Sequence, residues 1–158
     1  MSAVALLHDH TTFQNLQPLV TKNEIISSPP SPSSWLVTEA AVISPAGIEP
    51  DYRCITTTVP IGPFGSNNIT TTSAFIDTDD GLIIVFRAPL GLHGRNQWRV
   101  VPAEDRQGLV LREEARLTGL ALLMPFILMT ERKSHAEQGV RFSRKLEDRM
   151  STSEGGAP

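Results

Sequence analysis

The sequence has one cysteine, no long apolar run and no excess of basic charge. Cys54 alone cannot form an internal disulfide, and no signal peptide is evident at the N-terminus, so we expect a reducing, cytoplasmic setting. The 14 Lys and Arg residues against 17 Asp and Glu give a net charge of −3, which argues against a nucleic-acid partner. The longest apolar segment, Leu117 to Met129, is shorter than the roughly 20 residues of a membrane span and contains Pro125.

Several chemical motifs are also missing. The chain has no G-x-S-x-G elbow, no phosphate-binding glycine-rich loop, no C-x-x-C pair and no dinucleotide fingerprint. These absences disfavour covalent nucleophilic catalysis and redox chemistry, so we expect no cofactor. His8 and His10 flank Asp9, but on a helix they would point roughly 200° apart, and no third ligand lies nearby. We therefore expect no metal site. Asp9 either orients one of the histidines, or the triplet serves helix capping and packing against the sheet.

What the sequence does have is enough apolar residues for one core. A chain of 158 residues with 40% hydrophobic content predicts a single soluble domain over residues 1–150, followed by a polar, disordered tail over 151–158. With nucleic acid and membrane spans disfavoured, we expect the partner to be a small molecule or another protein.

The order of helix-like and strand-like hydrophobic patterns along the chain predicts the fold. One or two short helices are expected between Leu6 and Pro18, with Asp9, His10 or Thr11 as a cap. Alternating Thr-, Val- and Ile-rich segments separated by turn residues then predict an antiparallel meander, with Asp79-Asp80-Gly81 as a hairpin turn. The expected strands are Val20–Ser28, Trp35–Ile43, Tyr52–Pro60, Asn68–Asp77, Leu82–Pro89, Asn96–Val101 and Leu109–Leu117.

A long amphipathic helix is expected at the C-terminal end. The residues Met124, Leu128, His135, Gly139, Phe142, Leu146 and Met150 fall on one stripe at 100° per residue. The whole order predicts an α+β fold in which a curved antiparallel sheet of six or seven strands wraps around this helix. The gap between helix and sheet is the natural ligand cavity.

This layout, with particular residues, resembles a known superfamily. The residues that carry the likeness are Leu7-His8-Asp9-His10, Gln17-Pro18-Leu19-Val20, Ala88-Pro89-Leu90-Gly91, Trp98-Arg99-Val100 and His135. They resemble the START-like (SRPBCC, Bet v 1-like) superfamily, and most closely a fungal subgroup that includes polyketide cyclases forming α-pyrone rings. The resemblance implies a helix-grip fold. Such a fold normally begins with a strand before the short helices, so here the first strand is either missing, which leaves an open sheet edge and favours a homodimer, or reduced to a stub at Ser2 to Leu6.

Strand and helix periodicity single out two inward ionisable side chains. Glu113 has the parity of the apolar residues Leu111 and Ala115, so it is expected on the inner face of the sheet. It is either a general acid or base, or a structural partner of a nearby arginine. His135 lies on the apolar stripe with Glu131 one turn earlier to orient it. It is either a proton-transfer group or a satisfied core residue.

Arginines and aromatic residues complete the expected site. Arg53, Arg87 and Arg99 lie in predicted strands, and an inward arginine would stabilise an oxyanion or bind a carboxylate. We expect Arg53 or Arg87 to act in this way beside Glu113 and His135. The residues expected to contact the substrate are Tyr52, Phe86, Trp98, Leu128, Glu131 and Phe142.

Two functions follow from these expectations. The resemblance implies a cofactor-independent polyketide cyclase that closes an α-pyrone from a linear chain, with a hydrophobic substrate and a polyketide synthase as partners. The alternative is a non-catalytic carrier or sensor of hydrophobic small molecules, which needs only the cavity. A third possibility is that the chain only assembles with itself or with a synthase.

Overall fold

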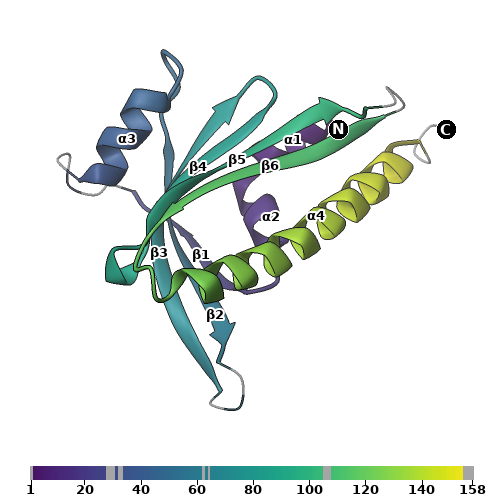
Figure 1. Ribbon diagram of the computed structural model, residues 1–158. Coiled ribbons are helices and arrows are strands. Elements are labelled where there is room, and N and C mark those ends of the chain that lie inside the picture. The colour runs from purple at the N-terminus through teal and green to yellow at the C-terminus, as the bar shows by residue number, and fades with distance from the viewer. Residues whose placement is uncertain are drawn as a thin grey trace.

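Six strands form one antiparallel sheet in the computed structural model, which describes residues 2–27, 31, 34–61, 63, 65–104 and 108–154. The strands are β1 (Val20–Ile25), β2 (Asp51–Pro60), β3 (Ser66–Thr78), β4 (Gly81–Arg87), β5 (His93–Pro102) and β6 (Leu109–Thr118). Each strand pairs with the next along the chain, so the sheet is the meander that the turn spacing predicts (Figure 1).

The hairpin between β3 and β4 is confirmed. Thr78 pairs with Gly81, with Asp79 and Asp80 in the turn. Gly81 is required there because a Cβ atom at this position would lie 1.9 Å from the carbonyl oxygen of Trp98 on the neighbouring strand β5. A side chain would therefore separate the two strands at this end of the sheet.

Two short helices precede the sheet, as expected. They are α1 (Ala3–His8) and α2 (His10–Asn15), and the side chain of Asp9 caps α2 by accepting a hydrogen bond from the backbone N–H of Thr12 at 3.1 Å. Because Ala3–His8 is helical, the alternative of a stub strand at Ser2 to Leu6 is wrong. Among the described residues the sheet has no strand before α1, so β1 and β6 are its two edges.

The segment Trp35–Ile43 is a helix, α3, and the strand expected there is wrong. Its Val, Thr and Ile residues favour a strand, but Ser34 caps the segment by accepting a hydrogen bond from the N–H of Val37 at 3.4 Å. Leu36 and Ala40, one helical turn apart, are both buried. A helix places both on the sheet, whereas a strand of this length would place a polar residue between apolar ones on each face.

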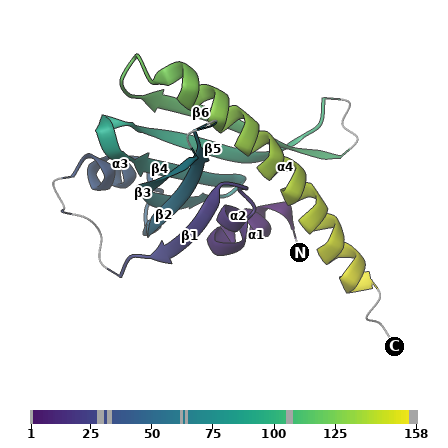
Figure 2. The ribbon, with the colours of Figure 1, turned by 90° about the horizontal axis from the view of Figure 1, so that it is seen from below.

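Helices cover both faces of the sheet. On the face that we call the inner face, Phe75, Leu82 and Trp98 pack with α1, α2 and the long helix α4 (Met124–Glu154). On the outer face, α3 packs on Ala74, Ile76 and Val85 through a second apolar cluster. Figures 1 and 2 show α4 running across one side of the sheet, with α3 on the other.

The long C-terminal helix is present, and the expected stripe is buried in its middle part, where Phe142 lies in the core and Leu146 packs against it. The buried face also includes polar residues that the stripe left out. Ser134 and Gln138 are 3% and 2% exposed, while Leu128 and Met150 of the expected stripe are 44% and 50% exposed. The helix also continues through Glu154, into the segment expected to be disordered, and residues 155–158 lie outside the described residues. No helix in the described part of the chain is long and apolar enough to cross a membrane.

Candidate functional site

A cavity of about 130 Å³ lies between the inner face of the sheet and the helices α2 and α4. Its apolar lining consists of Phe13, Ile55, Val59, Ile69, Ile84, Phe86, Ala88, Leu92, Trp98, Phe126 and Ile127. Its polar lining consists of Gln14, Gln17, Thr57, Thr71, Ser73, Asn96, Thr130, Glu131, His135 and Gln138. A dry cavity of roughly 150 Å³ holds benzene, so the enclosed space fits about one six-membered ring.

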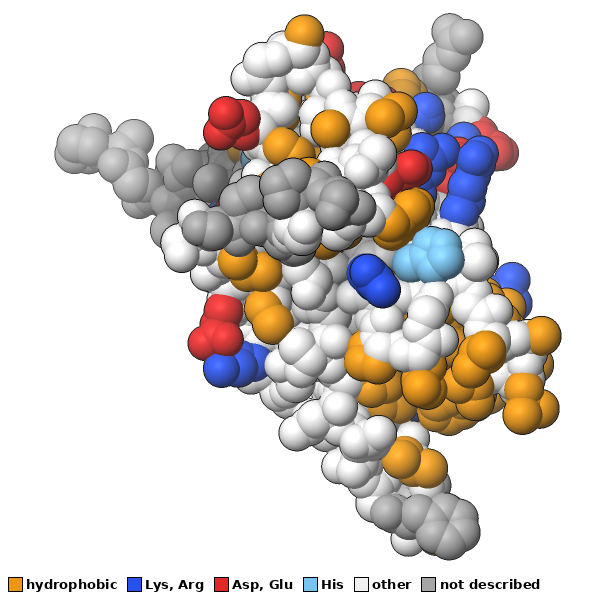
Figure 3. All heavy atoms as spheres, turned by 90° about the vertical axis from the view of Figure 1, so that its left-hand side faces the viewer, with side chains coloured by type: hydrophobic (Ala, Val, Ile, Leu, Met, Phe, Trp, Pro, Cys, Tyr) orange, Lys and Arg blue, Asp and Glu red, His pale blue; other side chains and the backbone are white. Residues whose placement is uncertain are grey.

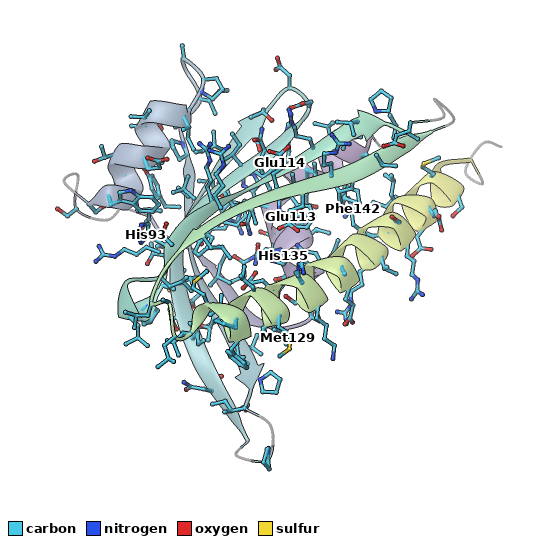
Figure 4. The ribbon with its side chains drawn as sticks, in the orientation of Figure 1. His93, Glu113, Glu114, Met129, His135 and Phe142 are labelled. Atoms are coloured by element: carbon cyan, nitrogen blue, oxygen red, sulfur yellow. The ribbon has the colours of Figure 1, made fainter. Side chains whose placement is uncertain are left out.

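Three ionisable side chains meet beside this cavity. His135 lies between Glu113 and Glu131, with 2.5 Å from its Nδ1 to Oε1 of Glu113 and 2.8 Å from its Nε2 to Oε2 of Glu131. Glu113 comes from β6, and the other two come from successive turns of α4. Figure 4 shows Glu113 and His135 pointing toward each other while Glu114 lies on the other side of β6, so the parity prediction for Glu113 is confirmed.

The two carboxylates keep His135 protonated. Burial alone would lower the pKa of the imidazole, but hydrogen bonds to Glu113 and then to Glu131 outweigh it and raise the pKa from 6.5 to about 9. At neutral pH both ring nitrogens therefore carry a proton, and each donates to one carboxylate. In this arrangement His135 has no lone pair with which to accept a proton from a ligand.

The two glutamates differ in their access to the cavity. Glu131 lines it, and its side chain is 39% exposed. Glu113 is absent from the lining, and its side chain is 21% exposed. The ring of Trp98 lies 5.5 Å from the imidazole and forms an apolar wall beside it. The group placed to exchange a proton with a ligand is thus the Glu131 carboxylate, oriented by His135, which is in turn held by Glu113.

Buried amides, which the apolar-stripe argument passed over, position α4. Gln138 donates to the backbone oxygen of Phe13 at 3.0 Å, and Gln17 donates to the hydroxyl of Ser134 at 3.4 Å. Both bonds join α4 to the chain around α2. The signal was present in the sequence as two polar residues spaced one turn apart beside His135, but the apolar-stripe argument did not use them.

Arg53 points inward yet serves a structural network instead of the cavity. Its Nε donates to Oδ2 of Asp51 at 2.7 Å, and its Nη1 donates to Thr11 Oγ1 at 2.9 Å. The same carboxylate lies 2.8 Å from Nδ1 of His10, whose Nε2 is 2.9 Å from Oδ1 of Asp77. Burial alone would raise the pKa of Asp51, but the hydrogen bonds from His10 and Arg53 lower it. This network ties α2 to the sheet.

The other arginines also lie away from the cavity. Arg87 is exposed and shares the outward parity of Val85, so the expected oxyanion role has no geometric basis. Arg99 has the same outward parity, opposite to that of Trp98, and its Nε lies 3.5 Å from Oδ2 of Asp80. None of the described residues that line the cavity is an arginine.

The expected substrate contacts divide into lining and non-lining residues. Phe86, Trp98 and Glu131 line the cavity. Tyr52 belongs to the outer-face cluster, and Leu128 is exposed. Phe142 is buried in the inner core, with its ring 6.0 Å from that of Phe13, so it supports the cavity from behind without lining it.

The start of α4 is apolar where it meets solvent. Phe126 lines the cavity and is 43% exposed, while the neighbouring Leu122 and Met129 are 91% and 64% exposed. Figure 4 shows Met129 on the side of α4 away from the sheet, and Figure 3 shows apolar side chains gathered at the lower right of the face it presents.

Within the described ranges, no group of three or more His, Cys, Asp or Glu side chains is arranged to hold a metal ion.

Comparisons with known proteins place the chain in a family without a described activity. No curated protein and no solved structure matches the chain. A family described as "Domain of unknown function (DUF7053)" matches residues 1–148. The match covers both N-terminal helices, all six strands and α4 as far as Asp148. The chain therefore belongs to the DUF7053 family.

Proposed function

We propose that the protein is a cofactor-independent cyclase that closes an α-pyrone ring on a linear polyketide. The observation that carries this proposal is the Glu131 carboxylate, held by His135 at the edge of an otherwise largely apolar cavity. The resemblance to START-like polyketide cyclases supports it. The long helix against a curved sheet supports a helix-grip assignment. Two features depart from the usual layout, namely α3 on the outer face and the absence of a strand before α1 among the described residues.

The proposed reaction is an acyl transfer within one molecule. The substrate is a 3,5-dioxo acyl thioester, whose C5 enol oxygen attacks the C1 thioester carbon. Glu131 accepts the enol proton as the C–O bond forms, the C–S bond breaks, and the leaving thiolate takes up a proton. The products are a 4-hydroxy-2-pyrone and a free thiol, with no oxidation or reduction.

The protein contributes position and a base. An apolar space of about one ring forces a flexible chain to fold back on itself, which converts a rare conformation into a populated one. Proton transfer to a fixed carboxylate contributes a further factor of about 10² to 10⁴. The His135 imidazolium fixes the orientation of Glu131, whose carboxylate accepts a hydrogen bond from Nε2.

The second candidate is a carrier of small apolar molecules. Two observations favour it. Both ring nitrogens of His135 are bonded to protein carboxylates, and the cavity lining holds no arginine among its described residues. In that function Glu131 only orients the polar end of the ligand. For either function the single cysteine supports a reducing compartment, and we propose a cytoplasmic location.

The experiment measures pyrone formation from the N-acetylcysteamine thioester of 3,5-dioxohexanoate. Wild-type protein is expected to exceed the buffer rate, and Glu131→Gln is expected to lose about 10² to 10⁴ of that acceleration. Glu137→Gln is the matched control, because Glu137 lies on the same helix and pairs with Arg141 on the surface. A wild-type rate equal to buffer, with tight product binding, would replace the cyclase by the carrier.

A further inference from the structure

Asn96 is a buried polar residue on the cavity wall with an unused hydrogen-bond acceptor. It is 8% exposed, it lines the cavity, and its Oδ1 has no hydrogen-bond partner in the described part of the chain. Two other buried side-chain nitrogens, on Asn23 and Arg99, also have none, but neither residue lines the cavity. Native proteins rarely leave a buried acceptor unsatisfied, so this exception requires a reason.

Four other polar side chains of the cavity lining have hydrogen-bond partners within the protein. Gln17 and Gln138 bond to α4 and to the backbone of α2, and the hydroxyls of Thr57 and Thr71 donate to backbone carbonyls of the sheet. These four side chains bond to other groups, and Oδ1 of Asn96 has no partner among the described residues. The position of this side chain is consistent with a partner that is not part of the protein.

The register of the sheet places Asn96 close to the three ionised groups. On β5, Asn96 stands two residues before Trp98 and shares its face, and Trp98 is directly opposite Glu113 on β6. Asn96 is therefore the diagonal neighbour of Glu113 on the inner face. A ligand in the cavity has a carboxylate, Glu131, on the helix side and an amide, Asn96, on the sheet side.

We propose that Asn96 is a specificity residue whose Oδ1 accepts a hydrogen bond from a hydroxyl group of the ligand. A buried acceptor without a partner favours a ligand that brings a donor, and an enol offers an O–H where the keto form offers none. The ligand class is then a small, largely apolar molecule with a phenol-like or enolic hydroxyl. This inference rests on the proposed function only in taking the cavity as the ligand site.

The test uses two probes of equal shape, 3-methylphenol and 1,3-dimethylbenzene, because a phenol is a locked enol and the second compound replaces its hydroxyl by a methyl group. Calorimetry gives the ratio of the affinity for the phenol to the affinity for the hydrocarbon. Asn96→Leu removes the amide at similar volume, and in this variant the ratio is expected to fall at least about tenfold. The melting temperature is expected to stay the same or rise, because an unsatisfied acceptor is replaced by an apolar group.

Gln97→Leu is the matched control, since Gln97 is the next residue of β5 and has the opposite parity; its ratio should equal that of wild type. Asn96→Ser provides a second variant if Asn96→Leu does not fold, and it should lower the ratio in the same direction. An unchanged ratio in the folded Asn96 variant, an equal loss for both probes, or no binding of the phenol by wild type would overturn the inference.

The binding ratio is measured without turnover. A protein that binds the phenol selectively through Asn96 but closes no ring would keep this inference and remove the cyclase. If wild type forms pyrone but Asn96→Leu leaves the binding ratio unchanged, the cyclase proposal stands and the role of Asn96 is removed.

Discussion

His135 on α4 and Glu113 on β6 are joined by a hydrogen bond of 2.5 Å between Nδ1 and Oε1. The bond connects the C-terminal helix to an edge strand of the sheet, beside the ring of Trp98. Since His135 also holds Glu131, this single contact links the stability of the fold to the orientation of the proposed base.

Glu113→Gln is predicted to destabilise the protein by about 1 to 3 kcal/mol at pH 7, because a partly buried imidazolium loses one of its two charged partners. Urea unfolding at pH 7 measures the change. Glu114→Gln, the next residue on the opposite face of β6, is the control and should change stability by less than about 0.5 kcal/mol. Equal effects of the two substitutions would show that the contact contributes nothing.

The stability of the protein is predicted to fall at alkaline pH because of His135. Its pKa in the folded state, about 9, is above the ordinary value of 6.5, so protonation favours folding. The contribution is fully present below about pH 6.5, declines as the pH rises and is lost above about 9; by linkage it is on the order of 3 kcal/mol at most. Unfolding free energies of wild type and His135→Gln, measured from pH 6 to 10, should converge. A difference independent of pH would contradict the assignment.

Phe142 is predicted to matter for stability and not for the ligand. Phe142→Ala removes a ring that is 3% exposed and is expected to cost about 3 to 5 kcal/mol. Leu128→Ala, on the same helix but 44% exposed, should cost less than about 1 kcal/mol. Both residues belong to the stripe expected from the sequence, so thermal unfolding of the two variants tests which part of that stripe is buried. If Leu128→Ala were the more damaging change, the start of α4 and not the region of Phe142 would carry the core contact.

The two arginines expected to be catalytic are predicted to differ in their effect on stability, and neither is predicted to act in pyrone formation. Arg53→Met is predicted to cost about 1 to 3 kcal/mol, because Asp51 and Thr11 lose a hydrogen-bonded partner. Arg87→Ala should alter neither stability nor pyrone formation, since Arg87 is exposed and outside the cavity. A large loss of turnover in a stable Arg87→Ala protein would restore its expected role.

The open edges of the sheet predict a homodimer. Within the described part of the chain, β1 pairs only with β2 and β6 only with β5, so each edge strand has backbone groups without a strand partner on one side. Size-exclusion chromatography with light scattering should then report twice the chain mass of 17.3 kDa. A monomer over the whole accessible concentration range would show that the edges are protected in another way.

The sequence predicted those parts of the fold that depend on local periodicity and turn chemistry. Alternation in β6 put Glu113 on the inner face, and Asp79-Asp80-Gly81 gave the β3–β4 hairpin. The prediction of a strand at Trp35–Ile43 was wrong because it rested on the β-branched residues alone and did not consider Ser34 as a helix cap. What decides there is tertiary, namely that Leu36 and Ala40 cover Ala74 on the outer face.

The sequence predicted part of the site. Of the expected residues, Phe86, Trp98, Glu131 and His135 line the cavity, whereas the others do not. Periodicity placed Glu113 on the inner face and Glu131 beside His135, but it could not tell that both carboxylates would bond to the same imidazole. Asn96 was missed because an asparagine in a strand carries no signal of its own; only burial without a partner distinguishes it. Arg53 and Arg87 could not be assigned, since the direction of a strand side chain depends on pairing across the sheet.

The most direct test of the central claim is the titration of His135 by NMR of its ring nitrogens in wild type and Glu131→Gln. The account predicts that both nitrogens are protonated at pH 7, that the wild-type ring titrates near pH 9, and that loss of the Glu131 charge moves the titration to lower pH. A ring that is neutral at pH 7, or that titrates near 6.5 in both proteins, would contradict it.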